Sequence, residues 1–167
     1  LQILEIKSLN VVGTVGDVGS KKSSSNVTNY LNIKNKITYL DNYSSDSDVM
    51  KINLEEREEE AKLKFDNVFL LNVLENIYNY KNCLNNCYLI LNEKGSFYGS
   101  TPFFFRIHLS PNDYFRFTEQ SILKSLEDAG FKEVEVKVLN GGIFLCFYNS
   151  ISTISQKIPM MNNFLFI

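Results

Sequence analysis

The stretch that most restricts the fold is the apolar run Phe65–Leu74, "FDNVFLLNVL". Both faces of such a strand would be apolar, which is typical of a strand in the middle of a sheet that helices cover on both sides. Segments of strand type and helix type alternate on either side of this run. The sequence therefore predicts an α/β layer architecture with a largely parallel sheet.

The other expected elements are short and are separated by turn residues. We expect strands at Leu1–Ile6, Lys36–Asp41, Asp48–Leu54, Ser96–Thr101, Phe131–Leu139 and Ile143–Tyr148. One helix should begin near Tyr80 and be closed by "NEKGS", Asn92–Ser96. A second helix should begin after the N-cap Thr118 and end at Gly130, and the charged run Glu55–Glu60 should lie in solvent.

Composition excludes several classes of function. The chain has 167 residues, of which 44% are hydrophobic and 22% charged, so one globular domain with one core is expected. A net charge of -2 gives no general attraction for nucleic acid, and no apolar run approaches the ~20 residues of a membrane-spanning helix. The 3 cysteines predict free thiols in a reducing cytoplasm. We expect Cys83 and Cys87 to pack in the core and not to bind a metal.

The chain divides into an α/β domain, 1–148, and an apolar C-terminal segment, 149–167. We expect this segment to pack on the domain or on a partner subunit, which would make the protein a homo-oligomer. Peripheral contact with a membrane surface is a weaker interpretation, because Lys157 is the one basic residue there. The apolar end and the absence of an initial Met suggest a fragment or truncated form.

The densest chemistry lies in "HLSPNDYFRFT", His108–Thr118. This stretch follows an expected strand, so it should form part of the rim at the carboxyl edge of the sheet, where ligands of parallel α/β sheets bind. A second interpretation remains open: Asp113 and Arg116 could form an ion pair that braces the loop, while Tyr114, Phe115 and Phe117 pack it down.

The order of these pieces resembles the class I S-adenosylmethionine-dependent methyltransferases. The stretches that carry the resemblance are "FDNVFLLNVLENI", "CLNNCYLILNEKGSFYGSTPF" and "HLSPNDYFRFTEQSILKSLEDAGFKEVEV". The third is similar to an HxxPxDYxRFT pattern of methyltransferases in surface-polysaccharide and related small-molecule pathways. The resemblance implies a Rossmann-like sheet of order 3-2-1-4-5-7-6 with an antiparallel last strand, helices on both faces, and S-adenosylmethionine as cofactor.

The resemblance also implies roles for individual residues. Those that would contact the cofactor are Glu5, in the supposed first-strand motif "LEI", Asp41, Asn53 and Leu74. Those that would act in catalysis on the acceptor side are His108, Asp113 and Arg116. Those that would line the substrate site are Tyr114 and Phe103. Among them His108 is the plausible base, since imidazole titrates at about 6.5.

Several positions depart from the family pattern. "KSLN", Lys7–Asn10, stands where a Gly-rich GxGxG turn is expected after the first strand, and Asn53, Asn76 and "NEKGS" replace other typical residues. We therefore carry two hypotheses: methyl transfer to a small acceptor such as a sugar or lipid-linked molecule, or a non-catalytic methyltransferase-like protein that binds a partner. A domain for another nucleotide ranks last, because neither GxGxxG nor a Walker lysine is present.

Overall fold

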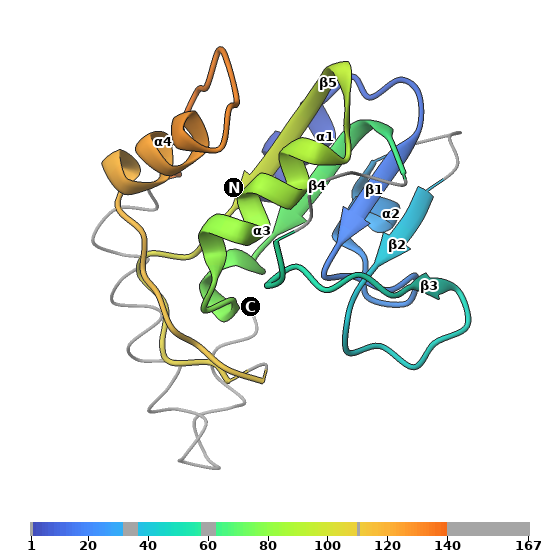
Figure 1. Ribbon diagram of the computed structural model, residues 1–167, viewed down its shortest axis with the longest axis horizontal. Helices are drawn as coiled ribbons and strands as arrows, with labels where there is room; N and C mark the ends of the chain where they lie inside the picture. The colour runs from blue at the N-terminus through green and yellow to red at the C-terminus, as the bar shows by residue number, and fades with distance from the viewer. Residues whose placement is uncertain (1, 32–36, 58–62, 110, 140–167) are drawn as a thin grey trace, which may run out of the picture.

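A computed structural model describes residues 2–31, 37–57, 63–109 and 111–139 of the chain. These residues form one five-stranded sheet in the order β3-β2-β1-β4-β5, and all neighbouring strands are parallel (Figure 1). The strands are β1 (Val15–Val18), β2 (Ile37–Leu40), β3 (Val49–Met50), β4 (Phe65–Leu71) and β5 (Leu91–Ser100). The predicted α/β fold with a parallel sheet is confirmed.

Helices lie on both faces of this sheet, with α3 in front of it and α1 and α2 behind it in Figure 1. The helices are α1 (Gln2–Ser8), α2 (Asn26–Tyr30), α3 (Tyr80–Leu89), α4 (Glu119–Asp128) and the short 3-10 helix η1 (Leu74–Asn76). Because side chains alternate along a strand, Phe69 packs with α1 and α2, whereas Val68 and Leu70 pack with α3. The core is thus two apolar layers with the sheet between them.

Three expectations about the helical half are confirmed. Helix α3 begins at Tyr80, and Cys83 and Cys87 are free thiols fully buried in the core. The Thr118 side chain accepts a hydrogen bond from the Ser121 N–H at 3.2 Å, which caps α4. Gly130, with φ +101°, follows the end of α4, since a left-handed residue there favours glycine.

The expected strand Leu1–Ile6 is wrong, because residues 2–8 form helix α1. A strand would have placed Leu4 and Ile6 on one face, but in the helix Ile6 is buried against the sheet while Leu4 is 66% exposed. The first strand is instead β1, Val15–Val18, in a stretch whose glycines suggested a loop. All 4 of its residues are buried.

Two expectations around β5 need correction. "NEKGS" does not close α3; it lies inside β5, where the pairing jumps from Phe65–Leu91 to Asn67–Ser96 and the extra residues form an irregularity. Phe131–Leu139 forms no strand within the described residues, and Glu133 has φ +54°, which interrupts extended backbone. Of the expected strand order 3-2-1-4-5-7-6, the described residues show the part 3-2-1-4-5. The expected strand Ile143–Tyr148 and the segment 149–167 lie outside the described residues. Among the helices described, none has the length and apolar character needed to cross a membrane.

Candidate functional site

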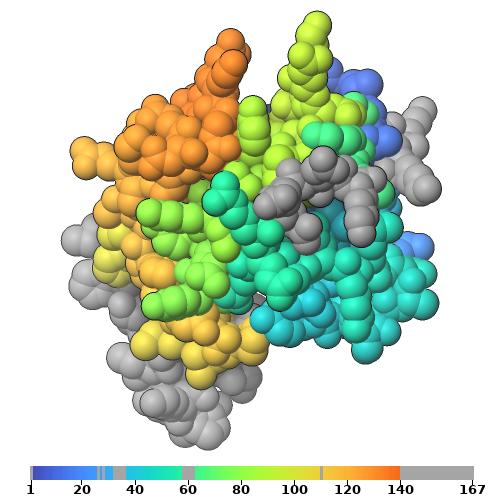
Figure 2. Space-filling view, viewed as in Figure 1, coloured from blue at the N-terminus to red at the C-terminus, as the bar shows by residue number. Residues whose placement is uncertain are grey.

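The carboxyl ends of the parallel strands meet at one edge, where the connecting segments collect. In Figure 2 the residues after β2 and β3 (cyan to teal) and the residues after β5 (yellow) lie along the same lower edge of the molecule. Ligands of open parallel sheets bind at this edge. The candidate site is therefore built from the turn after β1, the residues after β2 and β3, and the segments that follow β4 and β5.

The turn after β1 corrects the expected position of the Gly-rich motif. It runs from Gly19 to Ser23, not from Lys7 to Asn10, which follow no strand. Gly19 has φ +73°, and a Cβ there would lie 2.4 Å from a methyl carbon of Val73. Only glycine fits both conditions. In the spacing GxGxG, Gly19 keeps the first glycine, while Lys21 and Ser23 stand at the second and third positions.

Asp17 is the acidic residue of the first strand, the place expected for Glu5. The Asp17 side chain is 1% exposed and accepts a hydrogen bond from Ser25 Oγ at 2.5 Å. Burial raises the pKa of Asp17 to about 6, and hydrogen bonds from the Ser25 and Ser20 hydroxyls oppose that rise. Glu5 lies on helix α1, with its carboxylate in solvent 3.7 Å from Lys137 Nζ.

Sequence analysis missed Asp17 although a signal was present. The signal is the sequence Val-Gly-Asp-Val-Gly, in which two residues separate the acidic residue from the polar run "SKKSSS". Gly13 and Gly16 weaken the strand signal of this stretch, because glycine lowers strand propensity. In the structure, Gly16 lies beside the Phe65 ring, where a Cβ would come within 2.9 Å. This glycine therefore serves strand packing and not a turn.

Asp41 and Asn53 lie at the carboxyl edge, as expected, after β2 and β3. Asp41 Oδ1 accepts hydrogen bonds from the backbone N–H groups of Tyr43 and Ser44, at 2.6 and 2.9 Å, which leaves Oδ2 outside that turn. Asn53 Oδ1 accepts a hydrogen bond from the Glu55 N–H at 3.1 Å. Leu74 is 4% exposed and belongs to the core. Contact with a cofactor stays a prediction for these residues.

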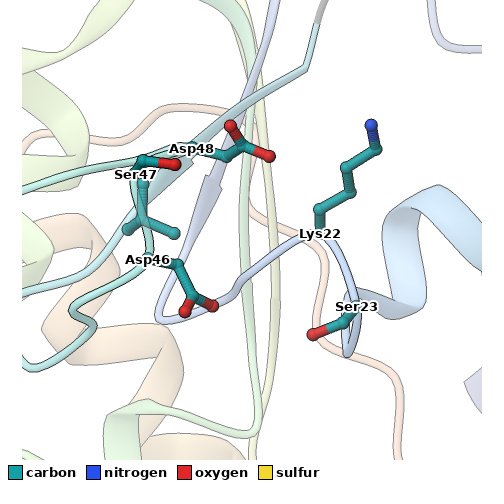
Figure 3. A pocket seen from close by; sticks show the side chains of 6 residues that line it. Lys22, Ser23, Asp46, Ser47 and Asp48 are labelled. Atoms are coloured by element: carbon teal, nitrogen blue, oxygen red, sulfur yellow. The ribbon is translucent and has the colours of Figure 1, made fainter.

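A shallow depression of about 470 Å³ lies between the turn after β1 and the loop before β3. Figure 3 shows Lys22 and Ser23 on one side of it and Asp46, Ser47 and Asp48 on the other. An ion pair of 3.4 Å between Lys21 and Asp46 joins the same two segments. Both side chains of this pair are about half exposed, so it contributes little to stability.

The loop His108–Thr118 is held against the segment after β4. Two of its backbone N–H groups, those of Tyr114 and Phe115, donate to the Glu75 carbonyl oxygen at 2.8 and 3.2 Å. Ring contacts reinforce this position, with centroid distances of 5.3 Å for Tyr78–Tyr114 and 5.2 Å for Tyr80–Phe115. The loop therefore lies at the rim of the carboxyl edge, where its sequence placed it.

Asp113 and Arg116 form the brace that the sequence left open as one interpretation. Both guanidinium NH₂ groups of Arg116 donate to the Asp113 carboxylate, which also accepts from the His108 N–H at 2.8 Å. The Asp113 side chain is 3% exposed, and the bonds from Arg116 and then His108 lower its pKa to about 2. Arg116 also donates to the carbonyl oxygens of Phe105 and Arg106.

The remaining predicted residues of the acceptor side are in solvent. The His108 ring is exposed and lies 6.2 Å from the Phe105 ring, centroid to centroid. Tyr114 and Phe103 are 45% and 57% exposed. The structure thus brings Asp113 and Arg116 into contact, but it places His108 beside them through its backbone and not through its imidazole. Catalytic and substrate-binding roles stay predictions for all of these residues.

Glu75 and Thr101 form a buried polar pair at the carboxyl edge of the sheet. Glu75 follows β4 and Thr101 follows β5, which is the neighbouring strand. Glu75 Oε2 and Thr101 Oγ1 are both buried, and neither has a hydrogen-bond partner of acceptable geometry among the described residues. The described residues contain no cluster of His, Cys, Asp and Glu that could hold a metal ion.

Comparison with solved structures identifies the architecture. The chain is similar to a Thermotoga maritima S-adenosylmethionine-dependent methyltransferase, named a possible histamine N-methyltransferase, with TM-score 0.58 and 16% identity over 79% of this chain and 70% of that one. A candidate methyltransferase from Bacillus halodurans gives TM-score 0.58 and 14% identity over 80% and 69%. The methyltransferase chain solved with the Haloferax volcanii Trm112 activator gives a TM-score of 0.53 and 16% identity over 77% of this chain and 66% of that one.

No protein-family model and no curated protein matches the chain. Identities of 14% to 16% to solved structures establish the fold and not the reaction. The sheet order, the helices on both faces and these neighbours agree with one another. The chain therefore has the Rossmann-like α/β fold of S-adenosylmethionine-dependent methyltransferases.

Proposed function

We propose that the protein transfers a methyl group from S-adenosylmethionine to a small-molecule acceptor. The observation that carries this proposal is the juxtaposition of Gly19 and Asp41 after the neighbouring strands β1 and β2. The Gly19 N–H donates to the carbonyl oxygen of Leu40, the residue before Asp41, at 2.7 Å. A turn that permits close backbone approach is thereby held next to a carboxylate that can accept hydrogen bonds from ribose hydroxyls.

The residues at this edge fit such a cofactor. Gly19 offers backbone without a side chain, Asp41 Oδ2 is outside its own turn, and Asn53 follows β3 where an adenine would lie. Asp17 lies buried at the end of β1, beneath the turn, and is bonded to Ser25. When bound, the cofactor supplies a methyl group activated by an adjacent sulfonium. The chain has to bind it, exclude water and orient the acceptor.

The acceptor side is proposed to lie between the segments after β4 and β5. Here the Asp113–Arg116 pair positions the loop, because its hydrogen bonds are used within the loop itself. His108, with its ring in solvent near Phe105, is the group that could take a proton. Phe103 and Tyr114 offer exposed apolar surface for the body of a small acceptor.

Isothermal titration with S-adenosylmethionine and with its demethylated product tests the cofactor site. We expect saturable binding by the wild type and roughly 10-fold weaker binding by Asp41→Asn, since a hydrogen bond from a ribose hydroxyl to a charged oxygen would be weakened. Asp128→Asn is the matched control, because Asp128 lies on α4 and pairs with Lys124. A folded protein that binds neither ligand at millimolar concentration would refute the proposal.

A second function is favoured by Lys21 and Ser23 in place of two turn glycines. A methyltransferase-like chain that no longer holds the cofactor could serve as a binding partner in a complex. One neighbour was itself solved as a complex, that of the Haloferax volcanii methyltransferase with its Trm112 activator. Restored cofactor binding by Lys21→Gly, in a protein whose wild type binds none, would support this alternative.

The buried free thiols Cys83 and Cys87 agree with a proposed location in the cytoplasm.

A further inference from the structure

One carboxylate oxygen of Glu75, in η1 after β4, is buried without a hydrogen-bond partner of acceptable geometry among the described residues. Glu75 is 6% exposed, and its Oε2 and the neighbouring Thr101 Oγ1 are buried oxygens without a hydrogen bond of acceptable geometry. The Thr101 hydroxyl is close enough to oppose part of the rise in the Glu75 pKa, but it is not aligned to bond well. Buried polar atoms of native proteins are nearly always bonded, so two adjacent exceptions indicate a missing partner.

The charges around Glu75 indicate what kind of partner would suit it. Burial raises the pKa of Glu75, and the Glu75 N–H and the positive charge of Arg116 oppose the rise while Asp113 adds to it. Arg116 cannot act as the counter-ion, because its guanidinium is bonded to Asp113. An ionised carboxylate in this position is costly unless a cation accompanies it.

Aromatic residues surround the backbone segment that carries Glu75. Tyr114 and Phe115 donate their backbone N–H groups to the Glu75 carbonyl oxygen. The rings of Tyr78 and Phe115 lie 6.3 Å apart, and those of Tyr80 and Phe117 lie 5.0 Å apart, centroid to centroid. A carboxylate in a segment lined by aromatic residues suits an organic ammonium, which combines a positive charge with an apolar body.

We propose that Glu75 and Thr101 bind the protonated amino group of the methyl acceptor, so that this subsite selects amines. The ammonium N–H groups donate to Glu75 Oε2 and Thr101 Oγ1, which supplies both missing hydrogen bonds and the counter-charge together. The assignment of this amine as the acceptor rests on the proposed function, whereas binding of an ammonium by the subsite does not.

The cofactor also carries an ammonium, in its methionine part, but the position of the subsite favours the acceptor. Thr101 follows β5, and the groups around Glu75 come from the 108–118 loop. Gly19, Asp41 and Asn53, which would hold the cofactor, follow β1, β2 and β3 on the other side of β4. The two ammonium sources therefore make opposite predictions for a Glu75 variant.

Access to the subsite requires movement of the segment that follows Thr101. Its side chains at Phe103, Phe105, Ile107 and Leu109 are 44% to 80% exposed, so they contribute little to the core. Arg116 holds its backbone through the carbonyl oxygens of Phe105 and Arg106, at 3.4 and 3.2 Å. Displacement of this segment would cost few buried contacts, and an entering amine would gain the apolar surface that it carries.

The test is titration calorimetry of the full chain with 2-phenylethylamine, compared with its neutral isostere 2-phenylethanol. We expect saturable binding of the amine and at least about 10-fold weaker binding of the alcohol, because a charge-assisted hydrogen bond is lost. Carbon-13 NMR of the glutamate carboxyl groups gives a second readout, in which the amine should lower the apparent pKa of Glu75. Equal binding of both probes, or no binding of the amine, would overturn the proposal.

Two variants separate the subsite from a merely structural role. Glu75→Gln should weaken amine binding roughly 10- to 100-fold, and Thr101→Val about 3- to 10-fold, in line with loss of a charged and a neutral hydrogen bond. Thr101→Val should not lower the melting temperature, because it removes an unbonded hydroxyl. A large loss of stability in Thr101→Val would show that Thr101 bonds to Glu75 in the free protein and would overturn the proposal. Glu93→Gln, on the exposed surface of β5, is the control.

Titration of Glu75→Gln with S-adenosylmethionine distinguishes failure of this inference from failure of the proposed function. Unchanged cofactor affinity with lost amine affinity supports the subsite as assigned. Lost cofactor affinity with unchanged amine affinity assigns Glu75 to the cofactor ammonium and overturns the inference. Amine binding in a wild type that binds no cofactor would leave the subsite standing and refute methyl transfer.

Discussion

The turn after β1, Gly19 to Ser23, and the loop His108–Thr118 lie at the same edge of the sheet but are held in place by different forces. The turn depends on close packing, with Gly19 against Val73, and on the buried Asp17–Ser25 hydrogen bond. The loop depends on an ion pair, on two backbone hydrogen bonds to Glu75 and on edge-to-face ring contacts. The loop His108–Thr118 is thus held largely by its own groups, whereas the turn after β1 retains the geometry of a ligand site.

Substitution of Gly19 tests whether close packing against Val73 holds the turn, and it should have the largest effect on the free energy of unfolding. Gly19→Val should lower the free energy of unfolding by about 3 kcal/mol or more, since it combines a left-handed backbone with a clash against Val73. Gly99→Ala is the control: it lacks a positive φ, and its Cβ would meet the edge of the Phe97 ring at 3.0 Å. Urea denaturation measures both. Equal effects would show that the close approach of Val73 is not decisive.

Asp17, the buried acid in β1 just before the turn, should make stability depend on pH. The folded state raises the pKa of Asp17 from 3.8 to about 6, so the folded protein keeps a proton that the unfolded chain loses. Stability is therefore lost as the pH rises from about 4 through about 6, by at most about 3 kcal/mol at about 1.4 kcal/mol per unit. Asp17→Asn should flatten this slope in thermal melts. A slope that survives the substitution would assign it to other groups.

The loop should respond to pH in the opposite sense. Asp113 has a lowered pKa of about 2, so its contribution to stability is present above about pH 4 and is lost as the pH falls towards 2. Asp113→Asn should remove this acid sensitivity. Intrinsic tyrosine fluorescence, to which Tyr78 and Tyr114 contribute among the 9 tyrosines of the chain, can be compared between the variant and the wild type during an acid titration. An unchanged acid transition in the variant would contradict the role of the ion pair.

Replacement of Arg116 should test the loop at neutral pH. Arg116→Gln leaves the buried Asp113 carboxylate with fewer donors, so we expect destabilisation by about 1–3 kcal/mol without loss of cofactor affinity. Lys124→Gln is the control, because Lys124 lies on α4 and pairs with Asp128. A variant of unchanged melting temperature would favour a direct role of Arg116 towards a ligand.

The Lys21–Asp46 pair should have the smallest effect on stability. Lys21→Ala should change the free energy of unfolding by less than about 0.5 kcal/mol, because both partners are half exposed. Cofactor affinity is the sharper readout, since Lys21 stands at a glycine position of the turn. A stability loss well above about 1 kcal/mol, which is more than exposed ion pairs usually contribute, would mean that the turn is held by charge after all.

The sequence was sufficient for features that depend on local pattern. The strand Phe65–Leu71, the start of α3 at Tyr80 and the cap of α4 at Thr118 have clear local signals, and each was predicted close to its observed position. The register of β5 could not be predicted, because the irregularity between Leu91 and Ser96 arises from pairing with Phe65 and Asn67. The sequence of either strand alone does not specify this pairing.

The candidate site was predictable at Asp41 and in the position of the 108–118 loop, but not at β1. A strand with the sequence Val-Gly-Asp-Val has weak intrinsic propensity, and it forms because β2 and β4 pair with it on both sides. The unbonded oxygens of Glu75 and Thr101 could not be predicted either, because they appear only when the fold brings the two residues together.

The contact between Gly19 and Val73 has a consequence for the order of events at the site. Val73 immediately precedes the helical turn Leu74–Asn76, which carries Glu75. Its methyl groups fill the space that a side chain at Gly19 would need, so the turn after β1 cannot shift towards β4 without displacing Val73. A cofactor that orders this turn should therefore also order Glu75, on which binding of the amine depends. We expect sequential binding, the nucleoside first and the amine second, which product-inhibition patterns would reveal.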